Sequence, residues 1–574
     1  MMFKIASQIA FSNASVLTIT TPMRHNPKDK RRLIGRSSPI NSFDDSSPPL
    51  TATTIQSPEP DHTSLIGQSL PTAATMGVLT TLRAERKAVL ICFIITFAAL
   101  QFGYDSSYFS GIQVLQPFLA VYGRFDPTTK KYVLSSSALS LVTSIINVGE
   151  FVGACSSFYI GDKLGLKKGL YIASFFIVIG TILQVAGTDE ASLICGRLLL
   201  GYAVGLISCF VPLYVAECAP TSIRGLVVSS YQFLIGIGLI IGLSVDYATS
   251  TRTDSGSYRI PMSTQLIFPF VFVTGLLTIA PESPRWLFRN KGPEAAAGAF
   301  KQLNGRRSSD EIQQQLNMMD AAMEMELTNS RQSSWKQVLS WGPEGRKAWI
   351  GFSMQALQQG TGVNFITGYG VAFFTAVGID NPFLISLGLY LVGIPALFSS
   401  AYLIERFGRR PILLGSGAVV AAVLIIMGAI GLSPNKTEAE KKVIVAMVYL
   451  FMFFFNAGWG PTVWVVCSEL STGPNRGKLM SVSTASNWFW NWLVSFTFPY
   501  LFNDDALGLG PKIGFIYGGL AVFGCVWIFF FLPETAGRSL EEIDEMFEKG
   551  VPAREFSSKC SLPFDGVGVF TNCN

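Results

Sequence analysis

Long apolar stretches alternate with short polar loops along most of the chain. Twelve of these stretches approach or exceed the roughly 20 residues that a helix needs to cross a hydrocarbon layer about 30 Å thick. We expect helices at the following positions, with ends good to about three residues: 88–112, 137–160, 169–187, 193–218, 227–248, 262–280, 347–376, 383–404, 411–432, 443–468, 479–503 and 512–532. The pattern predicts an all-α membrane protein with twelve transmembrane helices.

Part of the chain recurs 252 residues later. Two patterns are repeated at this offset. A glutamate followed seven residues later by an arginine occurs at Glu217/Arg224 and again at Glu469/Arg476. A Pro-Glu dipeptide occurs at 281–282 and again at 533–534. Self-similarity at a fixed offset indicates duplication, and parallel halves of hydrophobic helices are typical of secondary transporters. We therefore expect two six-helix halves that face each other across a substrate path.

Polar segments divide the chain into five parts. The first is a disordered tail rich in Ser, Thr and Pro (1–85), followed by a six-helix bundle (86–280). A linker with short helices (281–345) leads to a second six-helix bundle (346–532) and a C-terminal tail (533–574). In the linker, Glu294–Leu303 and Asp310–Leu327 favour helix. Ser539 and Glu542 form a capping signature that opens another short helix.

Composition and charge support membrane insertion and set its orientation. Only 14% of residues are charged and the mean hydropathy is +0.40, which excludes a soluble protein of this size. Lys and Arg cluster in the loops after the second, fourth, eighth and tenth helices, so we place these loops and both termini in the cytoplasm. Asn435 heads a glycosylation sequence in a loop expected outside. The net charge of +5 indicates topology and not nucleic-acid binding.

Several kinds of chemistry have no signal in the sequence. The nine cysteines show no disulfide or metal-ligand spacing, and both histidines, His25 and His62, lie in the N-terminal tail. We find no nucleotide-binding motif and no nucleophile–base set. The chain is therefore expected to be no enzyme and to hold no metal or cofactor.

Five motifs occur in order at the ends of the predicted helices. They are GR followed by PxYxxExxPxxxRG within 196–225, PESPRWL at 281–287, QQGTGVN at 358–364, ERFGRR at 405–410 and PETxGRS at 533–539. With these motifs the chain resembles the sugar porter family of the major facilitator superfamily from about Gly103 to Leu540, and in particular fungal-type monosaccharide and hexose transporters. The resemblance implies a transporter that moves a sugar by alternating access.

Buried amides are the main candidates for cargo contact. Gln358 and Gln359 stand mid-helix among apolar residues, where an amide is costly unless it has a partner. An amide offers a donor and an acceptor, which matches a sugar hydroxyl. Gly360 and Gly362 let the helix break and turn Asn364 inward. The alternative is that these amides only join helices to each other.

The resemblance adds further residues to the site. It implies sugar contacts from Gln232, Trp464 and Asn487, with Trp464 stacking on an apolar sugar face. It also implies that Asp105 in the first helix pairs with Arg197 at the start of the fourth, and that protonation of Asp105 breaks this pair. A permanent structural ion pair is the alternative. A second intramembrane acid, Glu150, has no role assigned by any motif.

Charges at the cytoplasmic helix ends form the last group of candidates. We expect a charge network between the halves that closes an inner gate, made of Asp162, Glu217, Arg224, Glu405, Arg409, Glu469 and Arg476. Two positions depart from the family pattern. Leu166 replaces the counterpart of Arg409, and Gly393 stands where an asparagine is usual, which leaves room for a different polyol-like cargo.

The sequence thus predicts a monomeric carrier in the lipid bilayer of the plasma membrane, with a sugar and a proton as its partners and no nucleic acid. The expected cargo is a monosaccharide, a hexose first, moved inward by proton symport. An uncoupled facilitator and a sugar sensor built on a transporter body remain as alternatives.

Overall fold

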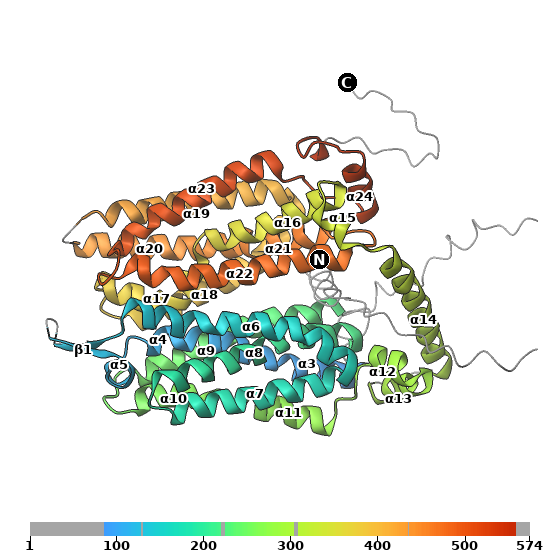
Figure 1. The fold of residues 1–574 in the computed structure, drawn as a ribbon, viewed down its shortest axis with the longest axis horizontal. Helices are drawn as coiled ribbons and strands as arrows, with labels where there is room; N and C mark the ends of the chain where they lie inside the picture. Colours follow the sequence, from blue (N-terminus) through green and yellow to red (C-terminus); the bar gives the residue numbers. More distant parts are fainter. Residues whose placement is uncertain (1–84, 128–129, 220–223, 304–307, 434–435, 558–574) are drawn as a thin grey trace, which may run out of the picture.

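Two bundles of long helices lie side by side with their axes along the length of the molecule (Figure 1). The computed structural model describes residues 85–127, 130–219, 224–303, 308–433 and 436–557. Helices suit this setting because a helix satisfies its own backbone hydrogen bonds where no water is present.

The N-terminal half contains eight of the described helices in its bundle. They are α3 (Arg86–Thr96), α4 (Ala98–Ile112), α6 (Ser136–Leu164), α7 (Leu166–Ala186), α8 (Glu190–Cys218), α9 (Arg224–Thr249), α10 (Gly256–Thr264) and α11 (Ile267–Thr278). The pairs α3–α4 and α10–α11 each form one predicted span. A short helix α5 (Gln116–Tyr122) and an antiparallel hairpin of β1 (Arg124–Asp126) and β2 (Lys131–Val133), with Arg124 opposite Val133, follow α4.

The C-terminal half repeats this plan with more interruptions. Its elements are α16 (Pro343–Gly360), α17 (Val363–Val377), α18 (Pro382–Phe407), α19 (Arg409–Ile430), α20 (Glu438–Phe454), the π-helix η1 (Phe455–Trp459), α21 (Gly460–Leu470), α22 (Arg476–Phe502), the 3₁₀ turn η2 (Gly510–Lys512) and α23 (Ile513–Phe531). A π-helix inside a longer helix often marks a functional site.

Short helices gather at one end of the molecule, which we call the linker end (Figure 1). They are α12 (Pro284–Lys291), α13 (Pro293–Leu303), α14 (Ser309–Gln332), α15 (Trp335–Leu339), α24 (Leu540–Glu548) and the 3₁₀ turn η3 (Glu555–Ser557). The predicted linker helices are confirmed, and Ser539 and Glu542 form the predicted capping box at α24. The opposite end, with α5 and β1, is called the hairpin end.

Each predicted span corresponds to one helix or to consecutive helices. Within the described residues, ten helical segments are long and apolar enough to cross a membrane. The other two predicted spans are α16–α17, which is broken at its centre, and α22, which is rich in Ser, Thr and Asn. Both contribute residues to the site described below.

Glycines bring helices of the N-terminal half into backbone contact. A Cβ atom on Gly149 or Gly201 would collide with carbonyl oxygens across the α6–α8 contact, and one on Gly103 or Gly238 would do so across the α4–α9 contact. Because only glycine leaves this space, the two helix pairs are held at their closest approach. We call these contacts the glycine seams.

The two halves are joined by hydrogen bonds at the hairpin end. The Ser136 backbone N–H donates to Asp505 at 2.8 Å, and the Ser140 hydroxyl donates to the Phe496 carbonyl. Gln113 also donates to the Gly368 carbonyl at 3.2 Å. These bonds tie α6 to α22 and its C-terminal loop, and α4 to α17. The described arrangement is therefore closed at the hairpin end.

Candidate functional site

Three amides from α16, α17 and α22 form a hydrogen-bonded chain, which we call the amide cluster. The helix breaks after Gly360 as predicted, Gly362 has a φ of 82°, and α17 starts at the next residue. The Gln359 Nε2 donates to Asn487 Oδ1 at 2.6 Å, and Asn364 Nδ2 donates to Gln359 Oε1 at 2.6 Å. The break thus brings Asn364 back onto the side of Gln359.

Gln358 accepts from the Gln359 Nε2 at 3.5 Å and has further partners on another helix. Its Nε2 donates to the carbonyls of Trp459 and Gly460, both at 2.9 Å. The π-helix η1 ends at Trp459 and α21 begins at Gly460. In this arrangement the Gln358 amide therefore joins α16 to the junction of these two helices.

The remaining predicted sugar contacts are more accessible. Gln232 is exposed on α9, one turn before Gly236, whose position faces Ile394 of α18 in the other half. Trp464 is half-buried on α21, one turn beyond Gly460. These two residues and the amide cluster come from both halves, and their contact with cargo remains a prediction.

Asn456 was missed by the sequence interpretation. This residue lies in η1 beside Gly393, and a Cβ on Gly393 would be 3.3 Å from the Asn456 Nδ2. Its amide also donates to the Met452 carbonyl at 2.9 Å. The polar group that seemed to be lost at position 393 is thus supplied from the neighbouring helix. A lone asparagine in a run of Phe, Ala, Gly and Trp was the signal for it.

The predicted coupling pair is buried but is not in direct contact. Asp105 and Arg197 are each 2% exposed. The Arg197 Nε donates to the Val142 carbonyl at 2.7 Å, and its guanidinium lies 3.6 Å from the centre of the Phe109 ring. Asp105 Oδ1 and Arg197 Nη1 have no hydrogen-bond partner. The expected ion pair is therefore open here, because the arginine is held by a carbonyl and an aromatic face.

A further buried acid, Asp246 of α9, was also missed. It is 0% exposed, and neither carboxyl oxygen has a hydrogen-bond partner. Its side chain fills the space beside Gly111 of α4. The signal was a single acid near the end of an apolar span, which is a functional candidate by default.

Four of the predicted gate charges have partners in their own half or in the linker. Glu469 accepts from Arg409, whose Nε is 3.0 Å from Oε2, and both residues belong to the C-terminal half. Asp162 pairs with Arg289 of α12 at 3.3 Å, and Glu217 accepts a hydrogen bond from the Ser283 hydroxyl. A charge network between the halves stays a prediction.

The remaining predicted residues are three gate charges and the glycosylation residue. Glu405 is exposed and Arg476 is half-buried at the start of α22. The side chain of Arg224 and the predicted glycosylation residue Asn435 lie outside the described residues.

The repeated Pro-Glu dipeptide has a structural role that the sequence did not reveal. Glu534 accepts hydrogen bonds from the backbone N–H groups of Arg409, Arg410 and Ala536 at 2.9–3.0 Å. Glu282 accepts from the backbone of Lys167 at 3.0 Å at the start of α7. A carboxylate at a helix N-terminus pairs with free N–H groups and with the helix dipole. The duplication therefore preserves one helix-capping device in each half.

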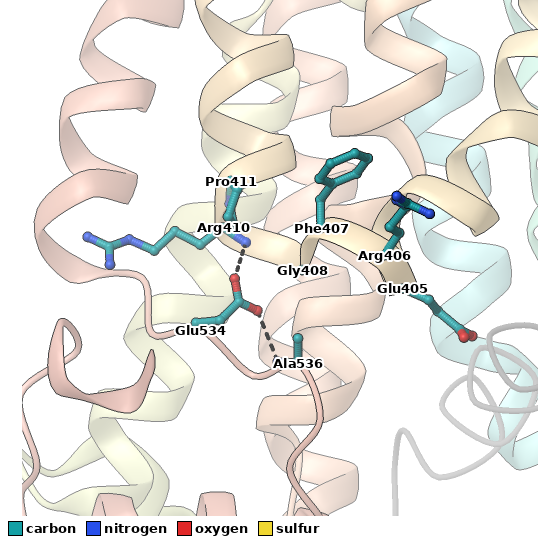
Figure 2. Close-up of a pocket in the computed structure, with 8 residues that line it drawn as sticks. All are labelled: Glu405, Arg406, Phe407, Gly408, Arg410, Pro411, Glu534 and Ala536. Atoms are coloured by element: carbon teal, nitrogen blue, oxygen red, sulfur yellow. Dashed lines mark hydrogen bonds between the residues drawn. The ribbon is translucent and has the colours of Figure 1, made fainter. Parts of the chain in front are cut away.

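Glu534 also lines a pocket of about 420 Å³ at the linker end. Figure 2 shows its carboxylate directed at the backbone of Arg410 and Ala536, next to the turn at Gly408. This pocket is lined by the α18–α19 turn and not by the amide cluster. We assign this pocket to the capping device.

Two bundles of membrane-spanning helices, a broken helix that carries amides and buried acids define a multi-pass membrane carrier. Residues 91–547 match the family model described as "Sugar (and other) transporter". The chain belongs to this family.

Known relatives and solved structures agree with this assignment. The chain is 34% identical to the major facilitator-type transporter ecdD of Aspergillus rugulosus, over 82% of this chain and 88% of that protein. It is 33% identical to the high glucose sensor RGT2 of Saccharomyces cerevisiae, over 83% and 63%, and 33% identical to the probable glucose transporter rco-3 of Neurospora crassa, over 80% and 79%.

The solved structure of the inward-open xylose transporter XylE from E. coli is similar in fold. Its TM-score is 0.66 at 23% identity, and the match covers 80% of this chain and 99% of XylE. The major facilitator fold with twelve membrane helices, predicted from the sequence, is confirmed.

Proposed function

We propose that this protein carries a monosaccharide, a hexose first, across the plasma membrane by alternating access, and that a proton moves inward with the sugar. The observation that carries this proposal is the amide cluster, where the Gln359, Asn364 and Asn487 side chains meet at a broken helix. Sugar hydroxyls both donate and accept hydrogen bonds, so they can replace the bonds that these amides now make to each other.

The two halves supply different parts of the mechanism. In the C-terminal half, the amide cluster, Gln358 and Trp464 form the main binding surface, and Gln232 completes it from α9. In the N-terminal half, Asp105 takes up a proton and its attraction to Arg197 then ends. Residues 86–280 and 346–532 are the units that rock against each other, and 281–345 links them.

We orient the linker end towards the cytoplasm, together with the tails 1–85 and 533–574. Arginines and lysines cluster in short loops at this end, after α6, α18 and α21, and the distribution of positive charge in membrane proteins favours the cytoplasmic side for such clusters. The hydrogen bonds at the hairpin end then close the outer side. The arrangement described here corresponds to an inward-facing carrier.

The test is uptake of labelled sugars by the full chain in a host that lacks hexose transporters. Hexoses, pentoses, polyols and quinate-like acids are compared, with and without a collapsed proton gradient. Replacing Gln359 with Leu is expected to raise the KM for the preferred sugar about 10- to 100-fold, since it removes hydrogen bonds worth about 1–3 kcal/mol. Transport of none of these compounds, or an unchanged KM, would overturn the proposal.

Gln355→Leu is the matched control for this variant. Gln355 is buried one turn earlier on α16, and its amide contacts the Cys467 sulfur at 3.7 Å instead of the amide cluster. Its replacement is expected to leave the KM close to the wild-type value. A parallel rise in both variants would mean that the effect comes from packing of α16.

A sugar sensor is the second candidate, and the similarity to RGT2 favours it. The match covers 63% of RGT2, so about a third of the length of RGT2 lies outside the matched region. Deletion of the tails that abolishes a glucose-dependent signal and leaves uptake unchanged would support this candidate.

A further inference from the structure

Three large apolar side chains are exposed where α15 meets the start of α16, a place that we call the α15 corner. Trp335 and Leu339 of α15 are 38% and 76% exposed, and Trp341, in the turn before α16, is 89% exposed. Exposed apolar residues on a spanning helix face lipid tails, but these three residues precede the predicted span 347–376. Because an apolar patch on a surface turn is unusual, the α15 corner indicates an interaction surface.

The depth of the α15 corner follows from its contact with two spanning helices. Val338 is the one buried residue of α15, and it lies in one apolar cluster with Ala348 of α16 and Leu479 of α22. Both partners lie at the beginning of predicted spans, 347–376 and 479–503. The helix α15 therefore lies beside the first membrane turns of α16 and α22, at the depth of the bilayer surface.

Hydrogen bonds hold α15 in this position. The side chain of Asn475, which is buried just before α22, accepts from the Ser334 backbone N–H at 2.8 Å and from the Ser333 hydroxyl at 3.2 Å. The Asn475 Nδ2 donates to the Gln337 side chain at 3.0 Å. One buried asparagine thus binds both the residues before α15 and its middle. While these bonds are kept, the exposed apolar residues cannot turn inward.

Two lysines flank Trp335 at the α15 corner. Lys336 follows it on α15 and is exposed, and the Lys478 Nζ lies 5.7 Å from the centre of the Trp335 ring. Among the described residues, neither lysine forms an ion pair with a carboxylate. The segment 333–343 and the whole of α22 contain no Asp or Glu. Lysines beside exposed Trp and Leu are typical of segments that lie in an anionic bilayer surface.

We propose that the α15 corner inserts into the bilayer surface at the linker end, and that Lys336 and Lys478 bind the headgroup of an anionic phospholipid there. Indole rings favour the boundary between headgroups and lipid tails. The headgroup phosphate supplies the negative charge that the two lysines lack within the protein. Since α15 is fixed to α16 and α22, which carry Gln359 and Asn487, the bound lipid holds the linker-end starts of two helices of the amide cluster. This contact does not depend on which compound the protein carries.

Fluorescence quenching tests the insertion in the full chain, reconstituted in vesicles of phosphatidylcholine and phosphatidylserine. The signal of Trp341 is the difference between wild type and the Trp341→Phe variant. Phosphatidylcholine brominated close to its headgroup should quench this difference signal, and aqueous acrylamide should leave most of it unchanged. Quenching by acrylamide alone would place Trp341 in water and overturn the inference. Quenching by neither reagent would mean that a second copy or another segment of this chain covers Trp341, which also overturns it.

Lipid titration of the purified full chain in detergent, followed by native mass spectrometry, tests the headgroup contact. Wild type should bind phosphatidylserine about 10- to 30-fold more tightly than phosphatidylcholine, and the Lys336→Gln/Lys478→Gln variant should lose most of this preference. The control Lys291→Gln/Lys301→Gln removes the same charge from exposed positions on α12 and α13 and should keep the preference.

An unchanged preference in the Lys336→Gln/Lys478→Gln variant would overturn the headgroup contact, and an equal loss in the control would mean that total charge alone attracts the lipid, which also overturns it. If the double variant does not fold, Lys336→Gln alone decides, because this change lies at an exposed position. It should lower the preference about fivefold, and a preference equal to that of wild type contradicts the proposal.

Discussion

The Arg409–Glu469 pair gives a quantitative test of how charges at the linker end stabilise the C-terminal half. Their side chains are only 13% and 7% exposed. Glu469 Oε2 accepts from Arg409 Nε at 3.0 Å and from the Thr535 hydroxyl at 2.7 Å. Replacing Glu469 with Gln removes the charge and leaves a mostly buried guanidinium without its counter-ion.

The structure sets the expected size of this effect. Removing one partner of a fully buried pair costs about 3–5 kcal/mol, and the partial exposure of Arg409 reduces this to about 2–4 kcal/mol. The exposed pair of Glu545 and Lys549 on α24, 43% and 38% exposed, is the control. Glu545→Gln is expected to change the free energy of unfolding by about 0–1 kcal/mol.

The assay is reversible unfolding in mixed micelles of the Glu469→Gln and Arg409→Gln variants and of the double variant. A double-mutant cycle isolates the interaction from other effects of each change. We expect the double variant to be more stable than the sum of the single effects predicts, by about 2 kcal/mol. A coupling energy below about 1 kcal/mol, similar to that of a surface pair, would show that burial does not strengthen this contact.

Three further predictions follow from the described contacts. Glu534→Ala should lower the free energy of unfolding by about 1–3 kcal/mol in the same assay, because three backbone N–H groups lose their acceptor; an effect below that of Glu545→Gln would contradict the capping role. Asp105→Asn should abolish sugar accumulation and leave exchange intact, measured with labelled hexose, and undiminished accumulation would defeat its assignment to coupling. Asn487→Leu should raise the KM for sugar about tenfold, since Gln359 loses its partner; an unchanged KM would exclude the amide cluster from binding.

The hydrophobic pattern was sufficient to predict most of the helices. Spans such as 169–187 and 411–432 are apolar on all sides, and such segments have few alternatives to a membrane helix. The break at Gly360 and Gly362 was also predictable, because a left-handed residue in a helix requires glycine. The π-helix at Phe455–Trp459 was not predicted from the sequence, and neither was the contact of Gln358 with the Trp459 carbonyl at its end.

The partners of the candidate residues were harder to predict than the residues themselves. Composition and motifs singled out Asp105 and Arg197, but not that a backbone carbonyl of α6 and the Phe109 ring would hold the arginine away from the acid. The gate charges lie at helix ends as expected, and the contacts described for them are with their own half or the linker, so the network between the halves stays a prediction. Sequence spacing does not reveal which conformation of a two-state carrier brings residues together.

The glycine seams have a consequence for how the molecule changes shape. Helices whose backbones touch cannot slide or tilt without steric overlap, so α4, α6, α8 and α9 form two rigid pairs within the N-terminal half. The C-terminal half has a similar contact between α19 and α23, where a Cβ on Gly514 would collide with the Leu424 carbonyl. It also contains a helix interrupted at Gly362 and another that passes through a π-turn. Bending during the transport cycle should therefore concentrate in α16–α17 and α20–α21, while Asp105 of α4 and Asp246 of α9, which belong to one rigid pair, keep a nearly fixed distance from each other. Distance measurements between spin labels on α6 and α8 should then vary far less between conformations than those between labels on α16 and α17.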